Sequence, residues 1–311
     1  MTPPFLALQR AAGTVAAYST AVRLGLLDHI DRAPADPDAV AVACGASRRG
    51  VRATLATLEA AGLVERLDDG RYRTVVPRLA GMHPALSLWN RLADTVRSGL
   101  AATEADDPVA AARLSLHTAA LPTPWDDVVR TVTERLPPAR TVLDVGAGTA
   151  PWTIALAARD ARCRVTALDL PPVLAVTRRA VAEAELSGQF DYLPGDLLNI
   201  RLPARHYDLI MVAQVCHLFD EATTESLLTR LSRALAPGGV LSVVDLSADS
   251  PGSAVHELSL LLRTRAGTLH RPEAYQHWLT AAGLTASDQV KLSADPELVL
   301  VVGGKPSGRS G

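Results

Sequence analysis

Cysteine and lysine are scarce in this chain of 311 residues. Its three cysteines, Cys44, Cys163 and Cys216, are too few and too scattered for a disulfide framework or a zinc site. We therefore expect a cytoplasmic protein in a reducing environment, with no bound metal. Lys291 and Lys305 are the only lysines, so arginine carries nearly all the positive charge, which we interpret as coding bias rather than function.

The sequence also lacks an excess of charge and long apolar runs. Its 31 basic residues nearly balance 33 acidic ones, so the formal net charge of −2 favours neither nucleic acid nor a membrane surface as partner. No apolar run approaches the ~18 residues typical of a membrane span. The first residues, MTPPFLALQR, lack the basic and apolar regions of a secretion signal. The length predicts a globular protein of about two domains.

The N-terminal part of the chain carries helical spacing followed by a hairpin. Apolar residues recur at helical spacing over residues 5–30, with Gly25 as an expected break, and again over 37–43 and 47–61. The segment 62–76, GLVERLDDGRYRTVV, alternates like two short strands joined by an Asp-Asp-Gly turn. Three helical segments and a hairpin predict a winged-helix fold.

Four regions follow from these patterns and from the proline pair 137–138, where regular structure is interrupted. We expect a winged-helix-like dimerisation domain over 1–82, a helical linker over 83–138, a Rossmann-like domain over 139–303 and a flexible tail over 304–311. Dimerisation is expected because the long apolar first helix needs a partner to cover it, and a second copy of the chain would serve.

From residue 139 onward, short apolar segments alternate with helical ones. The strand candidates are TVLDV, RVTALDL, FDYLP, YDLIMVAQV, GVLSVVDL and ELVLVV. Such alternation predicts an α/β fold with a parallel sheet and helices on both faces. The carboxyl ends of neighbouring parallel strands meet along one edge of the sheet, which is where ligands bind in such folds.

The strongest motif is VLDVGAGTA, residues 142–150, where a strand runs into a Gly-x-Gly turn that opens a helix. Gly146, Ala147 and Gly148 are the candidate ligand contacts, because glycine allows both a tight turn and a close approach of the backbone. Taken alone, such a turn also occurs as a purely structural feature.

Acidic residues end the next two strands. Asp169 lies about twenty residues beyond the glycine turn, where nucleotide-binding folds place an acid for ribose hydroxyls, and Leu170 follows it. Asp169 could also cap the helix that begins at Pro171. The third strand ends in Asp196 and Leu197, a second acid and an apolar neighbour suited to an adenine face. These segments can share one ligand at the sheet edge.

In these motifs and their order, the chain resembles the class I S-adenosylmethionine-dependent methyltransferases. Among them it is most similar to the dimeric small-molecule type that includes plant caffeic acid and acetylserotonin O-methyltransferases and bacterial natural-product enzymes. The matching segments are AAYSTAVRLGLLDHI, DGRYR, VLDVGAGTA, LDLPPVL, GDLL, VCHLFDE, ALAPGGVLSVVD and WLTAAGL. The resemblance implies S-adenosylmethionine as cofactor, a homodimer, a doubly wound Rossmann-like sheet with an antiparallel last strand, and a cofactor contact at Gln214.

The resemblance also implies where the chemistry occurs. His217 matches the general base of the plant enzymes, and an imidazole titrates near neutral pH and can accept a hydroxyl proton. The alternative is a structural histidine at a helix start. Asp245 matches one of two acids that flank the base, but the second acid matches Leu269 or His270, which leaves that arrangement incomplete. His270 and Trp152 are expected to contact the substrate.

One departure affects the glycine turn. Ala150 stands where the family usually has a third glycine, and alanine is the mildest replacement if this residue has helical dihedrals, so we expect cofactor binding to survive. Pro151 and Trp152 follow where the fingerprint Gly-x-Gly-x-x-Gly requires its last glycine, which disfavours an NAD-dependent dehydrogenase.

Together these features predict methyl transfer from S-adenosylmethionine to a small, aromatic or polyketide-like metabolite. Oxygen is the favoured acceptor, and carbon or nitrogen remains open. The linker helices and residues 250–275 are expected to line the substrate pocket.

Two other functions remain open. A methyltransferase fold could bind the cofactor and catalyse a rearrangement without transferring the methyl group. The winged helix could belong to a DNA-binding regulator, with Ser47, Arg48, Arg49 and Arg52 facing phosphates. However, residues 1–80 carry ten arginines against eight acids, which is far from a strongly basic footprint, so no nucleic-acid partner is expected.

Overall fold

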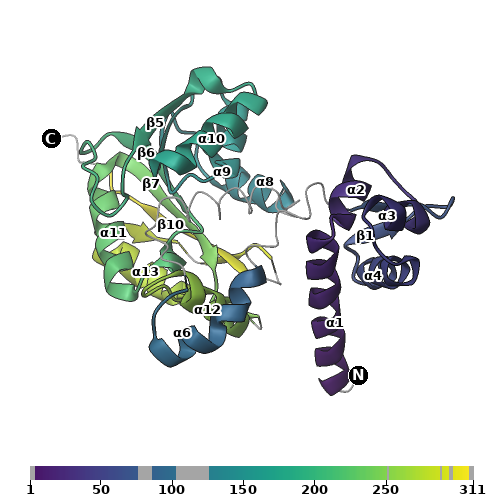
Figure 1. The fold of residues 1–311 in the computed structure, drawn as a ribbon. Coiled ribbons are helices and arrows are strands. Elements are labelled where there is room, and N and C mark those ends of the chain that lie inside the picture. Colours follow the sequence, from purple (N-terminus) through teal and green to yellow (C-terminus); the bar gives the residue numbers. More distant parts are fainter. Residues whose placement is uncertain are drawn as a thin grey trace. The chain divides into compact units, whose positions relative to one another are not determined.

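The computed structural model describes residues 4–75, 86–102, 126–250, 252–287, 289–293 and 297–307, and these form two compact units (Figure 1). One unit contains the described residues up to Ser87, and the other contains those from Leu88 onward. The predicted limit at residue 82 lies outside the described residues. None of the described helices is long and apolar enough to cross a membrane.

The N-terminal unit contains the predicted helices and hairpin. Its elements are α1 (Pro4–Arg23), α2 (Leu26–Arg32), α3 (Pro37–Ala43), α4 (Arg48–Ala60), β1 (Val64–Arg66) and β2 (Tyr72–Thr74). Gly25 has a φ of 71°, which separates α1 from α2. The Asp36 carboxylate and the Ser47 hydroxyl accept hydrogen bonds from the first amides of α3 and α4. The two strands pair antiparallel, so the predicted winged-helix elements are confirmed.

The first helix contributes little to the core of this unit. The core consists mainly of side chains from the other elements, including Leu26, Ile30 and Leu55. Within α1, Tyr18 and Ala21 are buried, whereas Phe5 is 75% exposed and Leu8 is 66% exposed. Part of the apolar surface of this 20-residue helix is therefore uncovered in the described chain.

The C-terminal unit is built on one sheet. Its elements in chain order are η2 (Leu88–Arg91), α6 (Leu92–Ser98), α8 (Asp126–Arg135), β3 (Thr141–Val145), α9 (Pro151–Arg159), β4 (Arg164–Asp169), α10 (Pro171–Glu183), η3 (Ser187–Gln189), β5 (Phe190–Pro194), β6 (Tyr207–Ala213), η4 (Cys216–Leu218), α11 (Glu221–Ala234), β7 (Leu235–Leu246), α12 (Ser253–Arg263), α13 (Pro272–Ala281), β8 (Thr285–Ala286), β9 (Val290–Lys291) and β10 (Leu298–Gly304).

The described strands pair in the order β5-β4-β3-β6-β7-β10-β8, with β9 paired to β10. Neighbouring strands from β5 to β7 are parallel, and β10 runs antiparallel to β7 with Leu300 opposite Val244. The chain order reverses between β3 and β6, which creates a crevice at the carboxyl ends of these strands. The doubly wound Rossmann-like sheet with an antiparallel last strand is thus confirmed.

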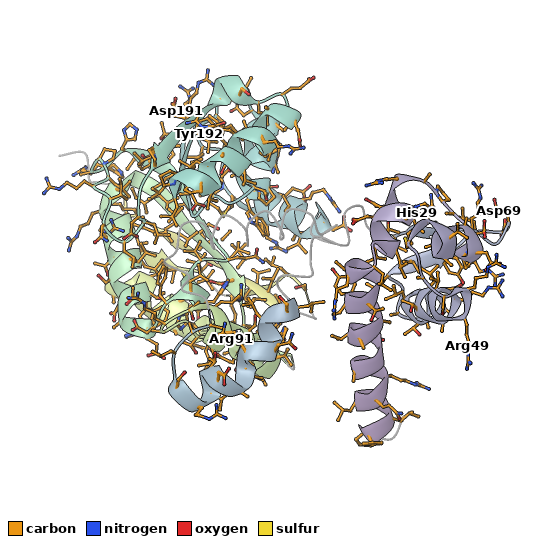
Figure 2. All side chains as sticks on the ribbon, in the orientation of Figure 1. His29, Arg49, Asp69, Arg91, Asp191 and Tyr192 are labelled. Carbon is orange, nitrogen blue, oxygen red and sulfur yellow. The ribbon has the colours of Figure 1, made fainter. Side chains whose placement is uncertain are left out.

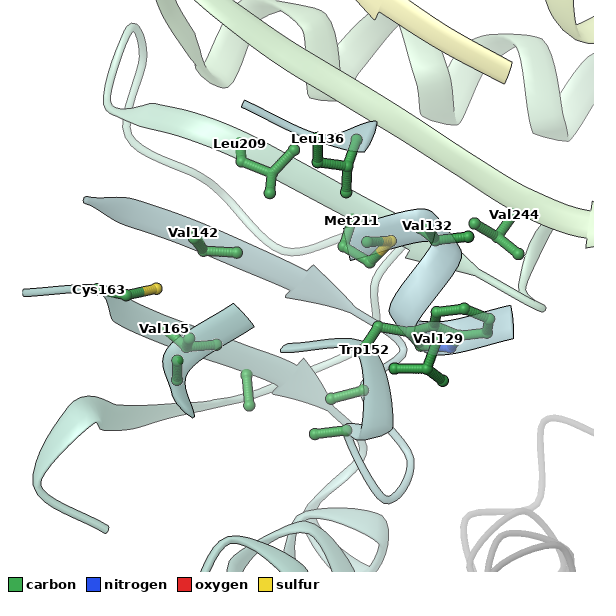
Figure 3. Close-up of a cluster of buried hydrophobic side chains, with 14 of the residues drawn as sticks. Val129, Val132, Leu136, Val142, Trp152, Cys163, Val165, Leu209, Met211 and Val244 are labelled. Atoms are coloured by element: carbon green, nitrogen blue, oxygen red, sulfur yellow. The ribbon is translucent and has the colours of Figure 1, made fainter. Parts of the chain in front are cut away.

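Helices cover both faces of the sheet because successive strand residues point to opposite sides. On one face, Val142 and Met211 belong to a buried cluster with Val132 of α8 (Figure 3). On the other face, Leu143 of β3 belongs to a second cluster with Leu228 of α11 and residues of α13. The two clusters fix the strand register, since a shift by one residue would exchange the faces.

The predicted linker is helical where it is described. Helices η2 and α6 pack against α12, and α8 packs against α9. Residues 103–125, including the predicted proline interruptions, lie outside the described residues.

The predicted flexible tail begins too early. Strand β10 continues to Gly304. The Lys305 ammonium donates hydrogen bonds to the carbonyl oxygens of Ser232 (2.9 Å) and Leu235 (2.8 Å). The prediction of a tail from residue 304 is therefore wrong for these first two residues, which pairing and hydrogen bonds hold in place.

Candidate functional site

The turn between β3 and α9 places backbone, rather than side chains, at the sheet edge. Gly146 has a φ of 68°, and a Cβ there would lie 2.6 Å from Cγ2 of Val215. Only glycine fits both constraints. The amides of Gly146 and Ala147 donate to the Leu168 carbonyl oxygen at 2.9 and 3.2 Å, which ties the turn to β4.

Gly148 is the open part of this turn. Its φ is 55°, and no other atom lies within 4 Å of the position a Cβ would occupy. Its carbonyl oxygen accepts from Thr177 Oγ1 at 2.6 Å, and its amide donates to Asp169 Oδ2 at 2.9 Å. A ligand can therefore approach the main chain closely at this glycine.

Ala150 adopts a different conformation from the one expected. It has φ 55° and ψ 39°, in the left-handed region, and it directly precedes α9. The expectation of helical dihedrals is therefore wrong, because the turn keeps the geometry that a third glycine would have. A non-glycine residue in this region carries a steric cost of about 1–2 kcal/mol.

Asp169, at the end of β4, holds the glycine turn and keeps spare acceptor capacity. Its Oδ2 accepts from Gly148, and its Oδ1 accepts from the Leu170 amide at 2.7 Å. These bonds use two of about four acceptor positions of a carboxylate. Burial raises the pKa of Asp169, and the two amide donors partly offset that rise. Helix α10 has no side-chain cap, so the capping alternative is wrong.

The loop after β5 adjoins the same edge. The Gly195 amide donates to the Asp169 carbonyl oxygen at 3.0 Å, which links the ends of β4 and β5. Asp196 is exposed, and its Oδ1 accepts from the Leu198 amide at 2.9 Å. The guanidinium of Arg230 donates to the carbonyl oxygen of Leu197. Of the predicted cofactor contacts, Gly146, Ala147, Gly148, Asp169, Leu170, Asp196 and Leu197 thus lie on adjoining loops at one sheet edge.

Gln214 lies where β6 ends. It is partly exposed, it has a φ of 57°, and its amide donates to the Val244 carbonyl oxygen at 2.7 Å. Uncommon backbone conformations of this kind concentrate at functional sites.

A buried acid lies beneath the glycine turn. Asp144 of β3 is 2% exposed and accepts a hydrogen bond from the Thr153 hydroxyl. Burial, reinforced by the negative charge of Asp169 and opposed by the Thr153 bond, raises the pKa of Asp144 to about 7. The sequence motif contains this acid, but only its burial explains why its pKa lies near physiological pH.

On the other side of the crevice, β6 and β7 bring His217 and Asp245 together. Nδ1 of His217 lies 2.5 Å from Oδ1 of Asp245, and the His217 backbone amide donates to Oδ2 at 3.1 Å. Asp245 is fully buried and His217 is 8% exposed. The two residues are far apart in the sequence, and the parallel pairing of β6 with β7 brings them together.

His270 and Leu269, which match the position of the second flanking acid, are both buried. His270 is 3% exposed, and its Nε2 lies 3.2 Å from the Cys216 carbonyl oxygen and 3.3 Å from Thr224 Oγ1. The ring thus supports the segment that carries His217, and the expected substrate contact at His270 stays a prediction. Leu269 is buried, and its amide donates to Glu257 Oε1 at 2.7 Å. The sequence gives no signal for this contact, because Glu257 lies on another element, α12, and meets Leu269 only in the fold.

Trp152 lies at the start of α9. Its side chain is 4% exposed and belongs to the buried cluster on one face of the sheet, near Val129 of α8 (Figure 3). It packs as a core residue, and the expected substrate contact stays a prediction. A tryptophan after a ligand-binding turn gives no sequence signal that distinguishes these roles.

Known proteins resemble this chain in sequence and in fold. The O-methyltransferase domain matches residues 90–285, more than half of the chain. The chain belongs to this family. It is therefore an S-adenosylmethionine-dependent methyltransferase, and the DprA winged helix domain also matches its residues 10–70.

Similar sequences come from bacteria and animals. A 3-hydroxy-5-methyl-1-naphthoate 3-O-methyltransferase of Streptomyces sahachiroi is 25% identical over 92% of this chain and 90% of its own length. The acetylserotonin O-methyltransferase of Rattus norvegicus is 28% identical over 85% of this chain and 68% of its own.

Solved structures share the fold of this methyltransferase. An O-methyltransferase family protein from Burkholderia thailandensis has a TM-score of 0.78 at 21% identity, covering 99% of this chain and 100% of its own. Human N-acetylserotonin methyltransferase, solved with its cofactor, has a TM-score of 0.77 at 21% identity, covering 98% and 99%.

The features of the crevice fit this cofactor. Gly148 leaves room for close approach, and Asp169 retains acceptor positions for the two hydroxyls of a ribose. On the winged helix, by contrast, three arginines are paired with carboxylates: Arg52 with Asp38, Arg71 with Asp69 and Arg73 with Glu65. Such pairing weakens a surface that would need free cations to bind DNA phosphates.

Proposed function

We propose that this methyltransferase methylates a hydroxyl group on a small aromatic or polyketide-like metabolite, with His217 as general base. The observation that carries the proposal is the buried bond between His217 and Asp245 at the edge where the cofactor motifs end. A base is needed for a hydroxyl acceptor because its proton must leave as the new bond forms.

The hydrogen bonding of His217 supports this role. A carboxylate only accepts hydrogen bonds, so the contact with Asp245 assigns the proton of the neutral ring to Nδ1. Nε2 then carries the lone pair that accepts the hydroxyl proton. The buried charge of Asp245 stabilises the imidazolium that results and fixes the ring orientation.

On the cofactor side, Asp169 is proposed to hold the ribose hydroxyls, with Asp196 and Leu197 against the adenosine. The main chain of Gly146–Gly148, together with Leu170 and Gln214, would surround the rest of the molecule. When bound, S-adenosylmethionine supplies a methyl group made electrophilic by the sulfonium charge. The residues of the chain then act by orienting the acceptor and the cofactor, which can supply ~7–11 kcal/mol of the barrier.

The substrate class rests on the relatives. One acts on a hydroxynaphthoate, and another belongs to tetracenomycin polyketide synthesis, with 29% identity over 46% of this chain and 42% of its own. Family membership favours methyl transfer over a non-methylating rearrangement and over a DNA-binding regulator.

A quantitative product assay tests the proposal. The purified protein is incubated with S-adenosylmethionine and a panel of hydroxynaphthoic acids and related phenols. We expect one S-adenosylhomocysteine for each methyl ether formed. Conversion of an acceptor without consumption of the cofactor would support the rearrangement instead.

We further propose a cytoplasmic homodimer that forms through residues 1–30 and the linker helices. Support comes from the exposed apolar side chains of α1, such as Phe5 and Leu8, and from three cysteines that are all free thiols. An obligate interface buries upward of ~2,000 Å². Light scattering should therefore report a dimer at micromolar concentration, and a monomer would contradict the proposal.

A further inference from the structure

Tyr275 of α13 belongs to the buried cluster that contains Cys216 and Val243, and it has no role in the site described above. It is fully buried, and its hydroxyl makes no hydrogen bond of ordinary geometry to the described residues. Its ring packs edge-on against His270 and Trp278, with centroid distances of 5.7 and 5.6 Å. A buried hydroxyl without a partner is costly, so its position calls for a physical reason.

The Asp245 carboxylate has an open acceptor position for this hydroxyl. Among the described residues, Oδ1 accepts from His217 Nδ1 and from the Leu246 amide at 2.8 Å, whereas Oδ2 accepts from the His217 amide. A carboxylate offers about two acceptor positions on each oxygen, so one position on Oδ2 is open. The Tyr275 hydroxyl and the Asp245 carboxylate interact electrostatically, so the donor and the open acceptor position belong to neighbouring buried groups.

The electrostatics keep the tyrosine in its donor form. Burial raises the pKa of Tyr275 well above its usual range. The charges of the nearby Asp245 carboxylate and Cys216 thiol, and a hydrogen-bonding interaction with Asp245, add to that rise. The other titratable groups that face this cluster are His217 on η4 and His270, the latter just before α13. At neutral pH, Tyr275 thus carries a proton that it can donate.

We propose that Tyr275 is a positioning residue for the base: its hydroxyl donates to Oδ2 of Asp245 and completes a chain from Tyr275 through Asp245 to His217. The inference rests on the proposed role of His217. The bond stabilises the buried carboxylate charge and keeps it from attracting the His217 proton too strongly. His217 is thereby kept neutral, and able to accept a proton, at a lower pH.

The direction of the effect follows from this arrangement. Removing the hydroxyl leaves Asp245 with fewer donors, so its charge stabilises protonated His217 more strongly. The titration of His217 should then move to higher pH. If the hydroxyl is an unpaired group, its removal should relieve a burial cost and leave His217 unchanged.

The test is nuclear magnetic resonance titration of the imidazole nitrogens in the full-length protein, which needs neither acceptor nor turnover. The His217 signals are assigned by their loss in His217→Gln. In Tyr275→Phe, we expect the His217 midpoint to rise by about 0.5–1 pH unit. We also expect the thermal midpoint to fall by about 2–4 °C. The product assay stays a separate test of methyl transfer.

Tyr72→Phe is the matched control, because the Tyr72 hydroxyl donates to Glu59 at 3.0 Å in the N-terminal unit. This variant should lower stability and leave the His217 midpoint unchanged. An unchanged midpoint in Tyr275→Phe, whether its stability falls or rises, would overturn the proposal. If Tyr275→Phe is too unstable for the titration, its loss of stability is still measured by chemical unfolding, and the Asp245→Asn protein supplies the second comparison. There the additional Tyr275→Phe change should cost less stability than in the wild type, and an equal cost would also overturn the proposal.

Discussion

The two halves of the sheet edge are built from different parts of the chain. On β3, β4 and β5 the site consists largely of main chain, with Gly146 and Gly148 held by amide bonds to Leu168 and Asp169. On β6 and β7 it consists of two side chains, His217 and Asp245, buried against each other. The first half fits a cofactor shared by a family, whereas the second performs the proposed proton transfer.

This difference implies opposite sensitivities. On the glycine side, the main chain itself forms the surface that faces the ligand. An added Cβ should therefore disturb this half of the site more than the change of a charged side chain outside the turn. On the His217 side, the backbone is ordinary, and the chemistry depends on which nitrogen carries a proton. Substitutions on the two sides should therefore separate cofactor affinity from turnover.

Apart from loss of the base itself, Asp245→Asn should have the largest effect, on turnover alone. The Asp245 carboxylate accepts from three donors, whereas asparagine offers only one acceptor oxygen. Asparagine therefore cannot accept from His217 Nδ1 and from the two backbone amides with equal strength, and it holds the Nδ1-protonated ring less firmly. We expect a loss of about 10³-fold in kcat, within the range for general acid–base catalysis. Cofactor affinity, measured by calorimetry, should stay near the wild-type value. A variant that loses affinity instead would erase the contrast between the two halves.

Asp169→Ala should act on the other half. It removes the proposed acceptor for the ribose hydroxyls and the bond that holds the Gly148 amide. Binding of S-adenosylmethionine should weaken by about 2 kcal/mol, roughly 30-fold in Kd. Calorimetric titration measures this directly, and an unchanged Kd would show that the ribose is held elsewhere.

Asp144→Asn should change how stability depends on pH. The folded-state pKa of Asp144 is about 7, above the unfolded value of 3.8, so the folded protein binds the extra proton between those values. Stability contributed by this group is present at low pH and is lost as pH rises toward 7. The gain from Asn should thus be largest above pH 7, a few kcal/mol at most, and should shrink toward pH 4.

Thermal unfolding of the Asp144→Asn protein and the wild type across that pH range measures the effect. Asp191→Asn, on the exposed surface of β5, is the matched control (Figure 2). A stability difference that stays constant with pH would show that burial does not govern this acid.

The smallest effect should come from removing one methyl group in the glycine turn. In Ala150→Gly, relief of the left-handed strain is offset by loss of a buried methyl and by a more flexible unfolded chain. The net change should stay within ~1 kcal/mol. The converse change, Gly146→Ala, adds the same atom against Val215 at a φ of 68° and should cost about 2 kcal/mol or more. Equal effects in chemical unfolding would contradict the steric conflict expected between a Cβ at residue 146 and Val215.

Most of the fold could be predicted because local patterns encode it. The break at Gly25, the capped helices after Asp36 and Ser47, and the alternation of strands and helices depend on residues close in sequence. The cofactor half of the site could be predicted for the same reason. Its glycines and the acid at Asp169 follow directly from the ends of strands.

Sequence patterns carry little information where a role depends on packing between distant elements. Trp152 and His270 have side chains suited to a pocket, and only the fold shows that Trp152 packs with residues of α8 and that His270 lies against the segment carrying Cys216. Ala150 adopts the left-handed conformation typical of glycine, in a turn that hydrogen bonds to Leu168 tie to β4. Tyr275 showed only helical spacing, and its relation to Asp245 exists only in the folded sheet.

His217→Gln, measured for turnover and for cofactor affinity in the same preparation, tests the central claim most directly. With an authentic hydroxyl acceptor, turnover should fall by ~10²–10⁴, because glutamine cannot take the proton. The Kd for S-adenosylmethionine should barely change, since the proposed adenosine contacts lie on other strands. His277→Gln, an exposed site on α13, is the matched control and should retain wild-type turnover. A His217→Gln enzyme with near-native turnover would show that His217 is structural and that the proton leaves by another route.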